Sequence, residues 1–217
     1  MIKRRILHML TSLVCIAMMF AVHTDMVSAS SVMGKTVIVD AGHGGYNPGA
    51  VANGSIEAEN NLAVAQLLAD RLTEAGANVV MTRTSDRAVA QNRTTLQAEL
   101  QARVTIAEQN KGDIFVSIHS NSNDNQKIEG AMTFYHNEAS RTLAEAVQKN
   151  LVYRTKANDK GVQTAGFYVI RHTSMPSVLV EMGFVTNPKE ARRLTEATYR
   201  ERLADGIYEG IEEYFRS

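Results

Sequence analysis

The sequence predicts one α/β domain, built on a mostly parallel, twisted sheet with helices on both faces. Two observations lead to this fold class. Short runs of β-branched and apolar residues alternate with longer segments of helical periodicity, a pattern typical of parallel strands joined by helical crossovers. The chain of 217 residues contains no internal repeat and no low-complexity tract, so its length fits a single domain.

The strands and helices are predicted from the period of their apolar side chains. Apolar residues three or four positions apart indicate a helix, and short continuous apolar runs indicate a buried strand. Strands are expected, in chain order, over residues 35–41, 78–82, 113–119, 131–135, 167–170 and 177–182. Helices are expected over residues 60–75, 95–109, 140–151 and 195–215. Two polar segments, 120–130 and 155–166, are predicted as loops long enough to border a groove.

Three of the helices have the clearest patterns. In the first, Leu62, Leu68 and Leu72 share one face, and Gly76 then supplies a stop signal. The second and the C-terminal helix repeat this spacing with the following apolar residues: Leu96, Leu100, Val104 and Ala107 in one, and Tyr199, Leu203, Ile207, Ile211 and Phe215 in the other. Each of these helices can therefore bury one face against a sheet.

The N-terminus has the composition of a secretory signal. A basic start at residues 3–5 precedes an apolar stretch over residues 6–22, and small residues then lead to Ala29. We expect residues 1–29 to be a signal peptide cleaved after Ala29, residues 30–34 to be a short linker, and residues 35–217 to form the catalytic domain. An uncleaved membrane anchor is the alternative, because about 17 apolar residues is near the lower limit for spanning a bilayer.

Charge and cysteine content exclude several classes of protein. Across the chain, 23 Lys and Arg balance 23 Asp and Glu, and loss of the basic signal leaves a slightly acidic protein. A nucleic-acid partner is therefore not expected. The only cysteine, Cys15, lies in the predicted signal. The exported chain would have no thiol, which excludes disulfides, cysteine-ligated zinc fingers and a cysteine nucleophile.

Two histidines mark the predicted functional site. His43 follows one strand-like run, and His119 ends another. In an α/β sheet, ligands bind beyond the C-terminal ends of the strands, so both imidazoles are expected at one edge. A catalytic zinc site takes three His or carboxylate ligands and leaves one position for water. Two histidines and one carboxylate would complete such a site.

Four acidic residues could supply the carboxylate of this site: Asp40, Glu57, Glu59 and Glu181. We assign Glu57 to the metal together with His43 and His119, because it begins a helix whose first turn could face the strand ends. Glu181 interrupts an otherwise apolar strand, where a carboxylate costs several kcal/mol unless it is paired or used in function. We assign it as the general base that takes a proton from the attacking water and passes it to the leaving nitrogen.

The same residues also have structural interpretations. A buried histidine is often only hydrogen-bonded within a core, and Glu57 could be a first-turn acid favoured by the helix dipole. Glu181 could be an ion-pair partner of Arg171 or Arg103. The other two histidines beyond the predicted signal are expected on the surface or at the rim of the site: His136 and His172.

Six segments carry motifs in a distinctive order: 39–45 around His43, 54–62 around Glu57, 81–86, 100–107, 117–122 around His119, and 175–187 around Glu181. In this order they resemble the motifs of zinc-dependent N-acetylmuramoyl-L-alanine amidases of the amidase-3 family. The resemblance covers roughly residues 35–216. It implies a six-stranded sheet flanked by helices, with one Zn²⁺ ion on His43, Glu57 and His119 and a catalytic glutamate at Glu181.

The family resemblance also implies a reaction, hydrolysis of the amide between N-acetylmuramic acid and L-alanine in peptidoglycan. Three positions depart from the family pattern: Ala58 replaces Lys, Glu59 replaces Asp, and Ser120 replaces Ala. None of these departures removes a ligand or the base, although Glu59 leaves open which acid binds the metal. The expected partner is peptidoglycan, met by an exported monomer in the periplasm, the cell wall or the medium.

The sequence does not determine how the activity is regulated, and it leaves two alternatives to the amidase function open. The stretch between His119 and Glu181 holds only one short predicted helix, so a long inhibitory insertion is not expected, nor is an appended wall-binding domain. The domain would be uninhibited, or controlled by a separate protein activator or by developmental timing, with membrane attachment if the signal stays uncleaved. The other functions are a non-catalytic peptidoglycan-binding or activator module and a metallohydrolase of another secreted amide.

Overall fold

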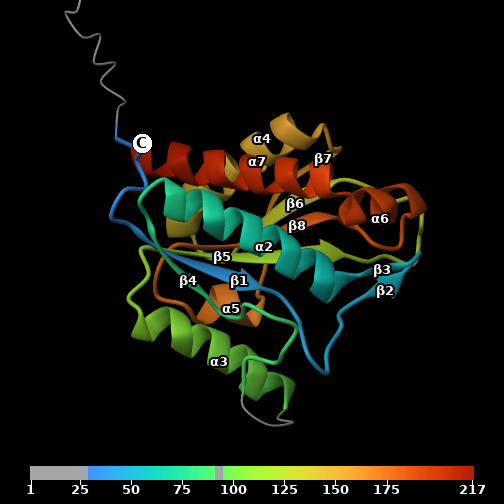
Figure 1. The fold of residues 1–217 in the computed structure, drawn as a ribbon, viewed down its shortest axis with the longest axis horizontal. Coiled ribbons are helices and arrows are strands. Elements are labelled where there is room, and N and C mark those ends of the chain that lie inside the picture. The colour runs from blue at the N-terminus through green and yellow to red at the C-terminus, as the bar shows by residue number, and fades with distance from the viewer. Residues whose placement is uncertain (1–28, 91–94) are drawn as a thin grey trace, which may run out of the picture.

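A six-stranded sheet organises the computed structural model, which describes residues 29–90 and 95–217 (Figure 1). The strand order is β4-β1-β5-β8-β6-β7. The strands are β1 (Thr36–Ala41), β4 (Asn78–Met81), β5 (Ile114–Asn121), β6 (Ala131–Tyr135), β7 (Asp159–Thr164) and β8 (Ser177–Phe184). Neighbouring strands pair in parallel except for β6 and β8, which are antiparallel. The predicted mostly parallel sheet is confirmed.

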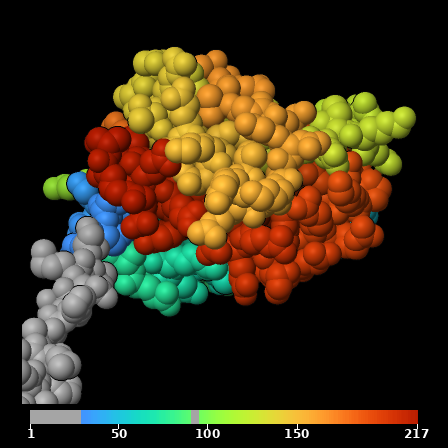
Figure 2. All heavy atoms as spheres, turned by 90° about the horizontal axis from the view of Figure 1, so that it is seen from above, coloured from blue at the N-terminus to red at the C-terminus, as the bar shows by residue number. Residues whose placement is uncertain are grey.

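Helices cover both faces of the sheet, as predicted. On one face lie α2 (Glu57–Glu74), α4 (Arg141–Thr155) and α7 (Ala197–Arg216), and on the other lie α3 (Leu96–Gln109) and α5 (Tyr168–His172) (Figure 1). The remaining elements are short: β2 (Val51–Ala52), β3 (Ser55–Ile56), the 3₁₀ turn η1 (Glu138–Ser140) and α6 (Pro188–Thr195). Figure 2 shows α4 and α7 packed side by side at the surface of the domain.

Alternate residues of the central strands belong to two separate cores. Val37 and Val39 of β1 pack into the core under α2, α4 and α7, whereas Ile38 between them packs into the core beside α3 and α5. This follows from the two-residue period of a strand. The same period directs Asp40, His119 and Glu181 toward the face covered by α3 and α5, at the C-terminal ends of β1, β5 and β8.

One predicted strand is wrong, and another strand lies in a predicted loop. Residues 167–170 were expected to be a strand, but they belong largely to α5. Val169 and Ile170 have high β-propensity, yet they are buried in the core shared with α3, and tertiary packing overrides propensity. The sixth strand is instead β7, within the segment 155–166 that was predicted as a loop. Its polar sequence suits an edge strand, where one side faces solvent.

The C-terminal helix predicted over residues 195–215 is confirmed as α7 (Ala197–Arg216), but a short helix before it was missed. This short helix is α6, and a break at Glu196 separates it from α7. The sequence did contain its start signal: Asn187 accepts hydrogen bonds from the N–H groups of Lys189 and Glu190, and Pro188 occupies the first turn.

The predicted signal peptide, residues 1–29, lies outside the described residues except for Ala29. Within residues 29–90 and 95–217, no helix has the length and apolar character needed to cross a membrane. Residues 30–34 pack onto the domain: Val32 is fully buried, and the Ser30 and Ser31 hydroxyls donate to the side chain and the carbonyl of Glu212 on α7.

Close packing between α4 and α7 gives a first prediction. A Cβ on Gly210 would lie 2.5 Å from the Val147 Cα and 2.8 Å from the Ala146 carbonyl oxygen. Ala favours a helix over Gly by about 1 kcal/mol, but overpacking against backbone costs typically about 1–3 kcal/mol. We therefore expect Gly210→Ala to lower the free energy of unfolding, measured with urea. Gly166→Ala, at a position with open space, is the control, and a Gly210→Ala protein as stable as that control would contradict the prediction.

Candidate metal centre

His43 lies in the turn that follows β1, with its backbone in the left-handed region at a φ of 61°. The Nδ1 atom of its ring lies 3.1 Å from the Asn47 Oδ1. An amide oxygen can only accept, so this contact favours the neutral tautomer with the proton on Nδ1. The lone pair on Nε2 is then free to bind a metal ion, an arrangement typical of metal-ligating histidines.

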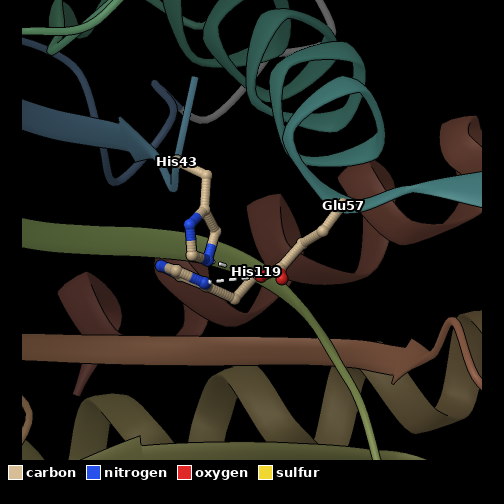
Figure 3. Close-up of side chains that lie close together, drawn as sticks. All are labelled: His43, Glu57 and His119. Carbon is tan, nitrogen blue, oxygen red and sulfur yellow. Dashed lines mark hydrogen bonds and ion pairs between the residues drawn. The ribbon is translucent and has the colours of Figure 1, made fainter. Parts of the chain in front are cut away.

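Glu57 and His119 meet His43 from two other elements. Glu57 is the first residue of α2, and His119 lies near the end of β5. The Glu57 Oε1 lies 3.1 Å from the His43 Nε2 and 2.9 Å from the His119 Nδ1 (Figure 3). The three side chains offer ligand atoms that all lie within 4.8 Å of one another. The structure therefore brings together the three residues that the sequence assigned to the metal.

Two glycines leave the room that this cluster needs. A Cβ on Gly42 would lie 2.2 Å from the His119 Nε2, and a Cβ on Gly49 would lie 2.5 Å from the Glu57 Oε2. Any other residue at these positions would displace a ligand side chain. Two imidazole nitrogens and a carboxylate oxygen form a donor set that suits a catalytic zinc ion with an open fourth position.

The electrostatics of Glu57 favour its charged form. Burial alone would raise the pKa of Glu57, but the imidazoles of His119 and His43 beside its carboxylate outweigh burial and hold that pKa well below the usual range. Glu57 is thus available as an anionic ligand at neutral pH. Glu59, the other acid in the first turn of α2, is exposed and does not belong to the cluster.

Glu181 lies beside the cluster in a different environment. It pairs in register with His119 across β5 and β8, and it is only 8% exposed. Its Oε2 atom is buried and has no hydrogen-bond partner in the described part of the chain. Burial, and then the negative charge of Glu57, raise the pKa of Glu181 to about 8. A buried carboxyl oxygen that no protein group satisfies is what a site for water or substrate requires.

Asp40 was a candidate metal ligand and Arg103 a candidate ion-pair partner of Glu181, but in the structure these two residues pair with each other. Asp40 accepts hydrogen bonds from Arg103 Nη1 at 2.7 Å, Thr82 Oγ1 at 2.7 Å and Ser117 Oγ at 2.6 Å. Burial would raise the pKa of Asp40, but the Arg103 charge and the two hydroxyls outweigh it and lower that pKa. Asp40 is therefore saturated and not in the metal cluster, and Arg103 pairs with Asp40 and Glu99, not with Glu181.

The two other histidines of the described residues, His136 and His172, are exposed, as expected. His136 contacts the Ala165 carbonyl, and His172 stacks on Tyr168. Two residues of the site were missed from the sequence. Asn47, which orients His43, gave no signal at all. Asn61 lies inside the motif around Glu57, and its Nδ2 atom lies 3.2 Å from the Gly42 carbonyl oxygen.

A mostly apolar cavity of about 130 Å³ adjoins His43 and His119. Its apolar wall comes mainly from α3, α5 and β8, with Leu100, Tyr168 and Leu179 among the lining residues. None of its lining residues comes from segments 120–130 or 155–166, which were expected to border a groove.

A mostly parallel α/β sheet with a His–Glu–His cluster at its strand ends is an arrangement that suits a metal-dependent hydrolase. A family model described as N-acetylmuramoyl-L-alanine amidase matches residues 37–213. The chain belongs to this N-acetylmuramoyl-L-alanine amidase family.

Individual relatives agree with this assignment. The chain is 42% identical over 192 residues to the uncharacterized protein YqiI of Bacillus subtilis, covering 87% of this chain and 88% of YqiI. It is 38% identical over 189 residues to the N-acetylmuramoyl-L-alanine amidase LytC of the same organism, covering 85% of this chain but 36% of LytC.

Solved structures show the same fold. The catalytic domain of the amidase CwlV from Bacillus (Paenibacillus) polymyxa superposes with a TM-score of 0.77 at 38% identity, covering 84% of this chain and 98% of that one. The CwlD amidase of Clostridioides difficile, solved in complex with the GerS lipoprotein, superposes with a TM-score of 0.78 at 33% identity, covering 84% and 99%.

The close approach of Gly42 to His119 gives a second prediction. The side chain of Gly42→Ala would overlap the imidazole, so His119 must turn away from Glu57. We expect zinc affinity, measured by competition with a chromophoric chelator, to fall about 10-fold or more. The same Gly-to-Ala change at Gly166, which has open space around it, should leave the affinity unaltered. Wild-type affinity in Gly42→Ala would show that the ring tolerates the methyl group.

The raised pKa of Glu181 gives a third prediction, for the metal-free protein. Between the ordinary glutamate pKa of 4.5 and a folded-state pKa of about 8, the unfolded chain releases this proton while the folded chain retains it. The Glu181 contribution therefore makes the free energy of unfolding fall as pH rises through this window, by on the order of a few kcal/mol in total. Glu181→Gln should remove this decline. Urea unfolding of both proteins at pH 5 and pH 8, in chelator, checks it, and parallel pH profiles would contradict it.

Proposed function

We propose that this protein is an exported, zinc-dependent amidase that hydrolyses the bond between N-acetylmuramic acid and L-alanine in peptidoglycan. The observation that carries this proposal is the convergence of His43, Glu57 and His119 beside the buried, unsatisfied carboxyl oxygen of Glu181. The family supplies the substrate class, because the relatives with a stated activity are N-acetylmuramoyl-L-alanine amidases.

The proposed ligands of a single zinc ion are His43 through Nε2, His119 through Nδ1 and Glu57 through its carboxylate. Zinc held there would polarise the amide carbonyl and lower the pKa of a bound water to about 7. Asn47 fixes the tautomer of His43, and the two glycines keep the ligand side chains in place.

Glu181 is the proposed general base. In its ionised form, a carboxylate oxygen accepts the proton of the attacking water and then delivers it to the nitrogen of the leaving L-alanine. A pKa raised toward neutrality by burial suits a group that must both accept and give a proton near pH 7. No protein donor occupies Glu181 Oε2 among the described residues, so this oxygen is free to accept the proton of the water.

The apolar cavity beside the ligands suits the uncharged part of such a substrate. Its walls exclude water from one side of the scissile bond, which strengthens the electrostatic interactions within the site. The protein partner remains part of the proposal: CwlD, of similar fold, was solved with a lipoprotein, so a separate activator of this domain is consistent with its fold.

Export completes the proposal, because peptidoglycan lies outside the cytoplasmic membrane. The basic and apolar composition of residues 1–29 supports a secretory signal or an uncleaved anchor. The alternatives differ in zinc content and turnover: a binding or activator module would not hydrolyse sacculi, and a hydrolase of another amide would leave them intact while cleaving a different substrate.

The fourth prediction tests both the reaction and the base. Sacculi digested with residues 30–217 should release stem peptides that begin with L-alanine, detected by mass spectrometry, and a chelator should abolish their release. Glu181→Gln should bind zinc normally but lower the rate by about 100-fold to 10,000-fold, the usual contribution of a general base. Full activity in Glu181→Gln would show that Glu181 is not the general base. Intact sacculi with the zinc-loaded wild type would remove the amidase proposal, unless addition of a partner protein restored cleavage.

A further inference from the structure

Arg83 is a fully buried cation with no counter-ion in contact. Its side chain is 0% exposed, and among the described residues no carboxylate lies within ion-pair distance of it. Its guanidinium is bonded to four backbone carbonyls instead, those of Ala41, Gly42, Ala58 and Ser85. Asp40, Asp86 and Glu99 lie near enough to act on its charge but do not contact it. Burial of a charge that no carboxylate contacts is costly, so its retention calls for a function that neutral residues would not fulfil.

The carbonyls that Arg83 holds are those next to the proposed metal ligands. Its Nη2 atom donates to the Gly42 oxygen at 2.9 Å and to the Ala58 oxygen at 2.8 Å. Gly42 precedes His43, and Ala58 follows Glu57. One nitrogen atom therefore joins the backbone that carries the first ligand to the backbone that carries the second.

No regular pairing could do the same. Strand β1 ends at Ala41, and His43 has a left-handed backbone, which is unfavourable for a residue with a Cβ. The Ala41 carbonyl, held by Arg83 Nε at 2.8 Å, is also bonded to Arg103 at 2.8 Å. The conformation of this turn is therefore stabilised by side chains that bind its carbonyl groups, which no neighbouring strand of the described residues pairs with.

We propose that Arg83 is a positioning residue for the metal centre, whose planar guanidinium fixes the distance between His43 and Glu57 by bridging the carbonyls of Gly42 and Ala58. Arginine suits this position because its donors have a fixed, planar geometry. Lysine would place a point charge with freely rotating donors there, and it could not reach the Ala41, Gly42 and Ala58 carbonyls in one plane.

This inference rests on the proposed zinc function, and its experiment measures metal binding, not turnover. Zinc affinity is determined by chelator competition for the wild type and Arg83→Lys, and the same proteins loaded with cobalt(II) are compared by visible absorption. We expect Arg83→Lys to bind zinc about 10-fold or more weakly, the range for groups that orient ligands, and to show a shifted, weaker cobalt spectrum.

Arg200→Lys is the matched control. Arg200 also bonds a backbone carbonyl, that of Leu194 at 2.6 Å, and a side chain of α2, the Asn60 Oδ1 at 2.9 Å, but neither neighbour is a proposed ligand. Its zinc affinity and cobalt spectrum should equal those of the wild type, even if the free energy of unfolding falls.

The outcomes separate positioning from a general structural role. Unchanged zinc affinity in Arg83→Lys overturns the proposal, whatever its stability. If the variant folds only with metal, the cobalt spectrum decides, and an unaltered spectrum overturns the proposal. A variant that folds neither with nor without metal assigns Arg83 to the fold alone. A wild type that binds zinc but leaves sacculi intact would refute the proposed function and leave this test valid, whereas a wild type that binds no zinc would end both.

Discussion

The register between β1, β5 and β8 is the constraint on which the rest of the molecule depends. Backbone pairing sets Asp40 opposite Ser117 and His119 opposite Glu181, so groups far apart in the chain meet at the same level of the sheet. A shift of one residue in either pair would turn these polar side chains into the apolar core under α2 and α7. The hydrophobic alternation of the strands therefore fixes the chemistry as well as the fold.

Three buried carboxylates near the strand ends differ in charge state because their surroundings differ. Asp40 is paired with a guanidinium and two hydroxyls, Glu57 faces two imidazoles, and Glu181 has a carboxyl oxygen without a partner. These environments lower the pKa of the first two and raise that of the third. Sequence position alone would not separate a structural acid from a ligand or a base, since all three lie at the end of a strand or the start of a helix.

The parts of the structure that were predictable from sequence are those where local pattern and burial agree. The long helices and the apolar strands have strong periods, and the two histidines follow strands whose C-terminal ends must lie at one edge. The strand predicted over residues 167–170 was wrong because aromatic and β-branched residues pack equally well in a short helix against α3. Strand β7 was missed because an edge strand needs few apolar residues. The contacts of Asn47 and Arg83 depend on turn geometry that no periodicity encodes.

The packing of residues 30–34 against α7 has a consequence for how the domain is presented. Val32 belongs to the core, and the serines before it are hydrogen-bonded to Glu212. The segment before β1 is therefore packed against the domain and does not form a free linker. The proposed ligands lie beyond the opposite end of that strand (Figures 1 and 3). The described part of the chain therefore begins at the end of the sheet opposite the proposed ligands, so whatever precedes it joins the domain on the side away from the candidate metal centre.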